Sequence, residues 1–135
     1  MPQLVKGGKW IFGWTIVSPD RFITIPPDAW IEYGFQIDDP IAFLKGSKTS
    51  GGFAVGRIET LNQKSALLLD RAIAHGSITT AGRIALPPAV DVHPGDHLLV
   101  ARGSGLALGF LIKGPIIDEA LKHPEIDIFL VADTP

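Results

Sequence analysis

The sequence predicts a mostly β fold in which two copies of one structural unit share a single core. The main observation is an internal repeat, since residues 21–30 are echoed by residues 82–90 and residues 35–55 by residues 92–112. A second observation is the content of turn-forming residues, 15 Gly and 11 Pro in 135 residues, which is typical of short strands joined by tight turns. Copies of roughly 60 residues are too small to be stable alone, so we expect each to cover the other.

Two constant offsets define the repeat. An offset of 61 positions relates the early parts of the copies, and an offset of 57 relates the later parts, so the second copy lacks four residues in the stretch that holds Trp30 to Gly34 in the first. We expect a single domain over residues 1–135, with repeat one at about 9–58, repeat two at about 70–113 and a C-terminal helix-strand appendage at 114–135. The matched pairs are Ile23 and Ile84, Pro26 and Pro87, Pro27 and Pro88, Asp39 and Asp96, Gly46 and Gly103, Ser47 and Ser104, Gly52 and Gly109, and Phe53 and Phe110.

In the first copy, runs of aromatic and β-branched residues predict the strands. Pro26 and Pro27 lack a backbone N–H and have a fixed φ, so a strand must end there and a helix can begin, and Gly34 is a natural helix stop. The glycine-rich segment 46–52 predicts a hairpin turn. The expected strands are residues 10–17, 22–25, 41–45 and 53–58, and the expected helix is residues 28–33.

The second copy follows the same plan with a shortened helical turn. Asn62 is a candidate cap for a helix between the copies, and Pro115 stands at the first position of a helix after the second copy. Asp96, in the place of Asp39, predicts a turn cap. The expected strands are residues 72–79, 83–86, 98–101 and 106–113, a linking helix covers residues 63–69, and Ile126, Ile128 and Leu130 alternate as a last strand.

Composition limits the classes of protein. The longest apolar runs are far shorter than the roughly 20 residues that span a bilayer, and the first residues lack the apolar region of a signal peptide, so we expect a cytoplasmic protein with no membrane contact. The chain has no cysteine, which excludes disulfides and a cysteine nucleophile. A formal net charge of −2 gives no overall attraction to nucleic acid, so a polyanion site must be a local patch.

No residue pattern indicates catalysis. His93 and His97 are four positions apart, but Pro94 and Gly95 between them prevent the helix that would bring both imidazoles to one face. The glycines of residues 103–109 are explained by a hairpin rather than by a phosphate loop. We therefore expect no enzymatic activity, no cofactor and no metal site.

The order of motifs resembles the swapped-hairpin AbrB-like family, which includes the AbrB, MazE and SpoVT types of DNA-binding domain. Gly-Arg-Ile-Ala-Leu-Pro at residues 82–87, Pro-Gly-Asp at 94–96 and the apolar strand at 98–100 carry the resemblance, and residues 21–26 are a weaker second match. The resemblance implies a β-barrel of interleaved hairpins, formed here as an intrachain pseudo-dimer of the two repeats. It also implies transcription regulation through binding of double-stranded DNA.

Within this resemblance, four basic residues are candidate DNA contacts. Arg83 follows the glycine turn, from which its guanidinium could reach a phosphate or a base edge, and Arg21 is its displaced counterpart. Lys45 and Arg102 occupy matching places before the hairpin glycines, and Lys48, Lys9 and Arg57 could enlarge a basic patch. The alternative for each is a solvated charge or an intramolecular ion pair.

A second hypothesis is a non-enzymatic protein-interaction module, antitoxin-like or structural, that has lost DNA binding. The acidic pI of about 6.0 and the predicted helix at 28–33, with two acids and no base, favour it. The apolar segment from Pro115 to Val131 would then contact the partner, and Trp14 and Trp30 either fill the core or anchor that partner. The chain is expected as a monomer or a homodimer, and no polar constellation indicates a small-ligand site between the halves.

Overall fold

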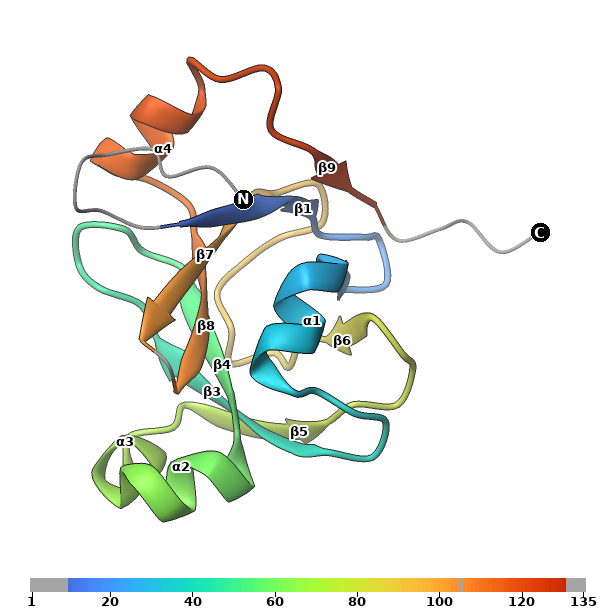
Figure 1. Cartoon of the computed structure of the whole chain (residues 1–135), viewed down its shortest axis with the longest axis vertical. Helices are drawn as coiled ribbons and strands as arrows, with labels where there is room; N and C mark the ends of the chain where they lie inside the picture. Colours follow the sequence, from blue (N-terminus) through green and yellow to red (C-terminus); the bar gives the residue numbers. More distant parts are fainter. Residues whose placement is uncertain (1–9, 105, 131–135) are drawn as a thin grey trace.

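The computed structural model describes residues 10–104 and 106–130, and this part of the chain is mostly β, as predicted (Figure 1). The first copy has four strands with one helix between the second and the third, and further short helices follow each copy. The elements in chain order are β1 (Ile11–Ile16), β2 (Phe22–Thr24), α1 (Pro27–Tyr33), β3 (Pro40–Lys45), β4 (Phe53–Arg57), α2 (Ile58–Lys64), α3 (Ala66–Asp70), β5 (Ala74–Ser77), β6 (Arg83–Ala85), β7 (His97–Ser104), β8 (Ala107–Leu111), α4 (Pro115–Ala120) and β9 (Ile128–Phe129).

Seven of these strands form one mixed sheet in the order β5-β3-β4-β8-β7-β1-β9, and β2 and β6 form a separate two-stranded ribbon. Neighbours in the large sheet are antiparallel except β1 and β9, which are parallel. The described strands do not form the closed barrel that we predicted. The reason is that β2 and β6, with three residues each, pair with one another and leave β5 and β9 as the two edges of an open sheet.

The two copies exchange their first strands. β1 of the first copy pairs with β7 of the second, and β5 of the second copy pairs with β3 of the first. The registers of these two pairs are equivalent under the repeat. Trp14 opposes Leu99 in the first pair, and His75 opposes Ala42 in the second. His75 is the counterpart of Trp14 at an offset of 61, and Leu99 is the counterpart of Ala42 at an offset of 57. Each copy therefore depends on the other for the hydrogen bonds of its first strand.

Two strand pairs join repeat-matched residues to each other. Ile23 opposes Ile84 in the ribbon of β2 and β6, and Phe53 opposes Phe110 where β4 meets β8. The rings of Phe53 and Phe110 are stacked, with centroids 4.7 Å apart and planes at 10°. Residues that the repeat matches meet across antiparallel pairs, so the copies are related by an approximate two-fold axis.

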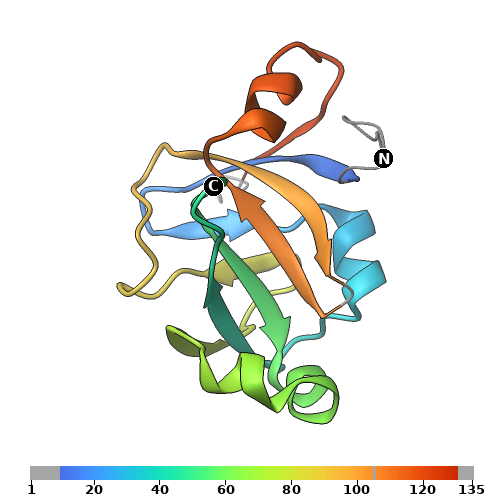
Figure 2. The ribbon, with the colours of Figure 1, turned by 90° about the vertical axis from the view of Figure 1, so that its left-hand side faces the viewer.

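The largest buried cluster contains side chains from both copies. Two smaller clusters lie beneath α2 and α3 and beneath α4; Figure 2 shows these helices at opposite ends of the two central hairpins. Trp30 and Trp14 are partly buried against the main cluster and the α4 cluster, respectively. Members of the main cluster include Ile23, Ile25, Phe43 and Phe53 from the first copy, and Ile84, Val100, Leu108 and Phe110 from the second.

The helices follow the predicted signals in part. α1 has Pro27 in its first turn and ends at Gly34 in the left-handed conformation, with φ of 69°, and α4 begins at Pro115, so these predictions are confirmed. The predicted linking helix at residues 63–69 is confirmed in part, but its start and its continuity are wrong: α2 already begins at Ile58 and buries Leu61, and Ser65, with φ of −161°, separates α2 from α3. Tertiary burial of Leu61 beside Ala42 and Leu44 overrides the local capping signal at Asn62.

Helix length also bears on membranes. The longest helices of the described chain, α1 and α2, have seven residues each, whereas a helix needs about 20 to cross a bilayer. Among residues 10–104 and 106–130, no helix is therefore long and apolar enough to be a membrane span.

Candidate nucleic-acid interface

The four predicted DNA contacts lie in different surroundings. Arg83 is half-buried on β6, where it opposes Thr24 and donates its backbone N–H to the carbonyl of Thr80 at 3.2 Å. Lys45 is exposed at the end of β3. Arg21 and Arg102 have their guanidinium groups hydrogen-bonded within the protein.

Arg21 holds the shortened turn of the second copy. Its guanidinium donates to three backbone carbonyls, those of Val92 at 2.5 Å, Pro87 at 2.9 Å and Val90 at 3.0 Å. The turn is four residues shorter than the corresponding stretch of the first copy, and the guanidinium provides donors for carbonyls that have no helix to pair with. Arg21 itself is left-handed, with φ of 63°, as is its repeat-matched residue Gly82, with φ of 76°.

Arg102 is paired with α1 in what we call the helix corner, formed by Glu32 and Tyr33 of α1 and Arg102 and Gly103 of β7. The Arg102 guanidinium makes a two-point contact with the Glu32 carboxylate through Nε, at 2.7 Å from Oε2, and through Nη2 to Oε1. The Tyr33 side chain hydrogen-bonds the backbone of Gly103, and burial raises the pKa of its hydroxyl. The helix corner is thus closed and its arginine is neutralised.

Lys45 belongs instead to a groove of about 620 Å³ that we call the lysine groove. Lys45 comes from β3, Lys48 from the tip of the β3–β4 hairpin, and Lys113 from the chain after β8, and all three side chains are exposed. None of the three forms an ion pair or a side-chain hydrogen bond with the residues that the structure describes. The remaining lining residues are Gly46, Ser47, Gly51, Gly52, Ile73, Ala89, Asp91 and Ile112, of which Asp91 alone is acidic.

The hairpin tip is held firmly against the end of β8. The Ser50 carbonyl accepts the backbone N–H groups of both Ile112 and Lys113 at 3.1 Å. Gly52 has φ of 69°, and a Cβ atom there would lie 1.9 Å from the Phe110 carbonyl oxygen, so only glycine allows this close packing. Lys48 and Lys113 are therefore presented from a fixed backbone, which limits the entropy lost when a ligand binds.

The helix corner and the lysine groove are repeat-matched places. The offset of 57 relates Lys45 to Arg102, and the shortened turn that contributes Ala89 and Asp91 to the groove stands where the first copy has α1. Figure 2 shows α1 on one side of the central hairpins and the chain that follows β6 on the other. The four-residue deletion removes the helix that would supply a partner like Glu32, so the matching basic side chain, Lys45, faces an open groove.

The hairpins also differ in length. Phe43 pairs with Val55, whereas the matching Val100 pairs with Phe110, so the second hairpin closes two residues sooner. The longer first hairpin carries Lys48 at its tip. Sequence reasoning missed Lys113, which lies 65 positions from Lys48 and comes near the tip only through the pairing of β4 with β8.

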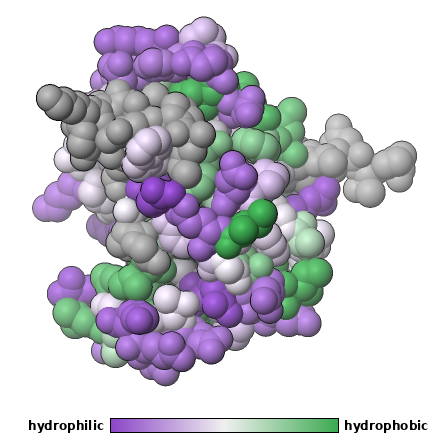
Figure 3. Space-filling view, viewed as in Figure 1, coloured by the Kyte–Doolittle hydropathy of each residue, from purple (hydrophilic) through white to green (hydrophobic). Residues whose placement is uncertain are grey.

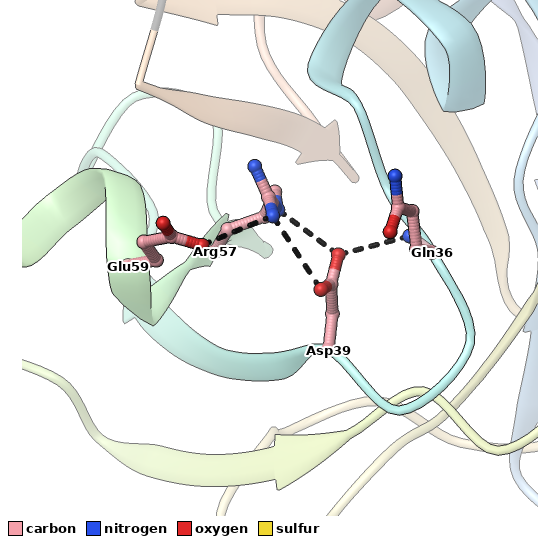
Figure 4. A network of polar contacts seen from close by, with 4 residues as sticks. All are labelled: Gln36, Asp39, Arg57 and Glu59. Carbon is pink, nitrogen blue, oxygen red and sulfur yellow. Dashed lines mark hydrogen bonds and ion pairs between the residues drawn. The ribbon is translucent and has the colours of Figure 1, made fainter.

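Arg57 does not extend this groove, because it takes part in a separate polar network (Figure 4). Its Nε atom lies 2.9 Å from Oδ2 of Asp39, its Nη2 atom contacts Glu59 at 3.4 Å, and Asp39 also accepts the backbone N–H of Gln36 at 2.9 Å. Asp96 caps the matching turn by accepting the backbone N–H of His93 at 2.8 Å, so its predicted capping role is confirmed. Lys9, the other residue considered for a basic patch, lies outside the described residues.

Other chemistry is sparse in the described chain. No group of three or more His, Cys, Asp or Glu side chains in residues 10–104 and 106–130 is placed to hold a metal ion. The lysine groove presents three ammonium groups, and ammonium groups bind anions such as phosphate. Comparison with known proteins adds no family, because no protein-family model, no curated protein and no solved structure matches this chain.

Proposed function

We propose that this chain binds double-stranded DNA as a transcription-regulator-type protein, with the lysine groove as its main contact. The observation that carries the proposal is the convergence of Lys45, Lys48 and Lys113 on one groove, where all three are exposed and none has a carboxylate partner among the described residues. The exchange of first strands between the copies supports the related proposal of a swapped-hairpin AbrB-like fold, in which two repeats take the place of two subunits.

The charge of the groove suits a phosphate backbone. Three lysines and one aspartate give a local excess of positive charge on a chain whose formal net charge is −2. Lysine binds phosphate as a point charge without sequence preference, and the release of counterions from DNA supplies the free energy. The groove therefore positions the duplex, and sequence recognition requires another side chain.

Arg83 is the residue we assign to that second contact, while Arg21 and Arg102 are assigned to support of the fold. Arg83 lies on the ribbon of β2 and β6, next to the Gly82 turn. Replacing it with alanine should lower affinity for a preferred duplex more than for an unrelated one, since loss of a base contact costs about 1–3 kcal/mol of discrimination. An equal loss on all duplexes would limit Arg83 to a phosphate contact.

Fluorescence polarisation with a labelled mixed-sequence duplex tests the groove. The wild-type chain should bind at about 50 mM salt, and the triple variant Lys45→Ala, Lys48→Ala, Lys113→Ala should show a slope of log affinity against log salt that is smaller by roughly 2–3, at about 0.9 per phosphate contact. Lys64→Ala is the matched control, because Lys64 is exposed at the end of α2 and does not line the groove. Absence of wild-type binding, or an unchanged slope in the triple variant, would disprove the proposal.

A second candidate function is protein interaction through the C-terminal segment 115–131, of which Val131 lies outside the described residues. Leu121, Ile128 and Leu130 are 70%, 55% and 61% exposed, and an open cleft of about 400 Å³ lies between α4 and β9 with Leu121 and Ile128 in its lining. Figure 3 shows hydrophobic surface in this region, among otherwise hydrophilic residues. Exposed apolar groups clustered in this way are typical of protein contact sites.

Truncation after Lys113 is a poor test of this candidate, because Ile117 and Ile126 cover Leu99 in the core. The double variant Leu121→Asp, Leu130→Asp leaves those buried residues intact and should abolish co-purification of a specific partner. Ile31→Asp, which changes a 75% exposed side chain on α1, is the control. Retention of the partner by the double variant would exclude this segment as the contact site.

A further inference from the structure

The approximate two-fold axis has a consequence for the kind of DNA that the chain can hold. A homodimer with two equal subunits presents two equal contact sites, which match the two halves of a palindromic site. Here the matched places are the lysine groove and the helix corner, and they differ in charge. The groove has three lysines that pair with no acidic side chain in residues 10–104 and 106–130, whereas the basic side chain of the helix corner, Arg102, is paired with Glu32.

The difference extends beyond one ion pair. In the second hairpin, the position 57 residues after Lys48 is Gly105, so the tip lysine has no counterpart in the sequence. α1 closes over the hairpin through the Tyr33 hydrogen bond to Gly103, whereas α1 is replaced at the groove by a short turn without a helix, whose carbonyls Arg21 binds. Steric access and charge therefore both favour the groove side.

We propose, on the basis of the DNA-binding function proposed above, that of the two repeat-matched places only the lysine groove engages the phosphates of duplex DNA, and that Glu32 keeps the helix corner closed to phosphate. The ligand is then a duplex without two-fold symmetry, held at one run of phosphates per chain. A palindromic site has no advantage for a single chain over an asymmetric duplex of equal length.

Polarisation assays over a range of salt concentrations test this asymmetry with three variants. Lys45→Ala should lower the slope of log affinity against log salt by about 0.9, whereas Arg102→Ala, at the matched position and with the same change of net charge, should leave the slope unchanged. Glu32→Ala should raise the slope by about 0.9, since it releases Arg102 for a phosphate contact. Glu59→Ala, which removes an equally negative, exposed residue elsewhere, should raise affinity slightly without changing the slope by a full contact.

The outcomes separate this inference from the function on which it rests. If the wild-type chain does not bind duplex DNA, both fail. If it binds and Arg102→Ala lowers the slope as much as Lys45→Ala does, DNA binding stands but the contact is two-sided and the inference is wrong. If Glu32→Ala raises the slope of log affinity against log salt no more than the Glu59→Ala control does, the role assigned to Glu32 is wrong. The inference is supported if the slope rises by a full contact only in Glu32→Ala and falls only in Lys45→Ala.

Discussion

The helix corner and the lysine groove occupy repeat-matched places, but they differ in what covers them and in whether their basic side chain is paired. In the helix corner, α1 covers the hairpin and Glu32 neutralises Arg102. In the groove, a turn shorter by four residues leaves Lys45 uncovered, and an extended hairpin adds Lys48. A repeat inside one polypeptide can diverge in this way, whereas two identical subunits must carry every change twice. The two copies of this chain can therefore differ in local cover and charge while they share one core.

The largest effect is expected from Gly52→Ala at the hairpin tip. Its positive φ disfavours a Cβ atom, and the new atom would lie 1.9 Å from the Phe110 carbonyl oxygen, so the backbone must shift at a cost above about 3 kcal/mol. Urea unfolding measures the free energy. Gly82→Ala is the control, because Gly82 also has positive φ but has open space around its Cα, and it should cost only about 1 kcal/mol. Equal losses for both variants would contradict the close packing of the tip.

Arg21→Ala tests how the shortened turn is held. The variant removes the donors to the carbonyls of Pro87, Val90 and Val92 and should destabilise the chain by roughly 2–3 kcal/mol. Thermal unfolding measures the loss, with Arg71→Ala, an exposed side chain after α3, expected to be within about 0.5 kcal/mol of wild type. An unchanged stability in Arg21→Ala would show that the turn keeps its shape without the guanidinium.

Arg102→Ala should have a smaller effect on stability. The pair with Glu32 is partly exposed, with about a third of each side chain accessible, so salt screens it. We expect a small decrease in unfolding temperature at low salt that disappears near 1 M salt. A decrease that persists at high salt would indicate that the helix corner depends on packing of the guanidinium rather than on charge.

The smallest expected effect is a pH dependence of stability that arises from His123, just after α4. α4 covers the second copy in the same way that α2 and α3 cover the first. A hydrogen bond to Glu125, at 2.7 Å, raises the pKa of His123 above its ordinary value of 6.5, and Glu119 adds to this. Because the folded pKa is the higher one, this contact stabilises fully below about pH 6.5 and its contribution is lost as the pH rises through the folded pKa.

NMR titration of the His123 ring checks this prediction directly. Glu125→Gln should lower the pKa of His123 and flatten the decrease of stability between pH 6 and 8, the range in which a raised histidine pKa acts. His75→Gln, a change on the exposed edge strand β5, should leave that decrease unaltered. A His123 pKa below 6.5 in the folded chain would refute the contact.

Local signals predicted much of the fold. Pro27 and Gly34 delimit α1 because both act through their own backbone, and β1 alternates between buried and half-buried residues as a strand with one covered face does. The early start of the linking helix could not be predicted, because Leu61 packs in a buried site that only the sheet creates. The resemblance predicted a closed barrel. The observed sheet is open because β2 and β6 pair with each other and not with the edges of the large sheet.

The candidate site was predictable only in part. Lys45 and Lys48 lie beside the hairpin glycines, and their sequence neighbourhood identifies them as basic residues at a turn. Lys113 could not be added, because its nearness to Lys48 results from strand pairing across the two copies. The engagement of Arg21 with carbonyls 66 to 71 positions away was equally invisible in a local pattern.

The sequence by itself determined that the chain is a duplicated, mostly β unit with a deletion in its second copy, since identities at constant offsets and turn-forming residues depend only on the order of residues along the chain. Only the tertiary structure decided which arginines are neutralised and which lysines remain open. The physical reason is that an ion pair or a groove depends on distances of a few ångströms between residues far apart in the chain, and those distances exist only once both copies are interleaved.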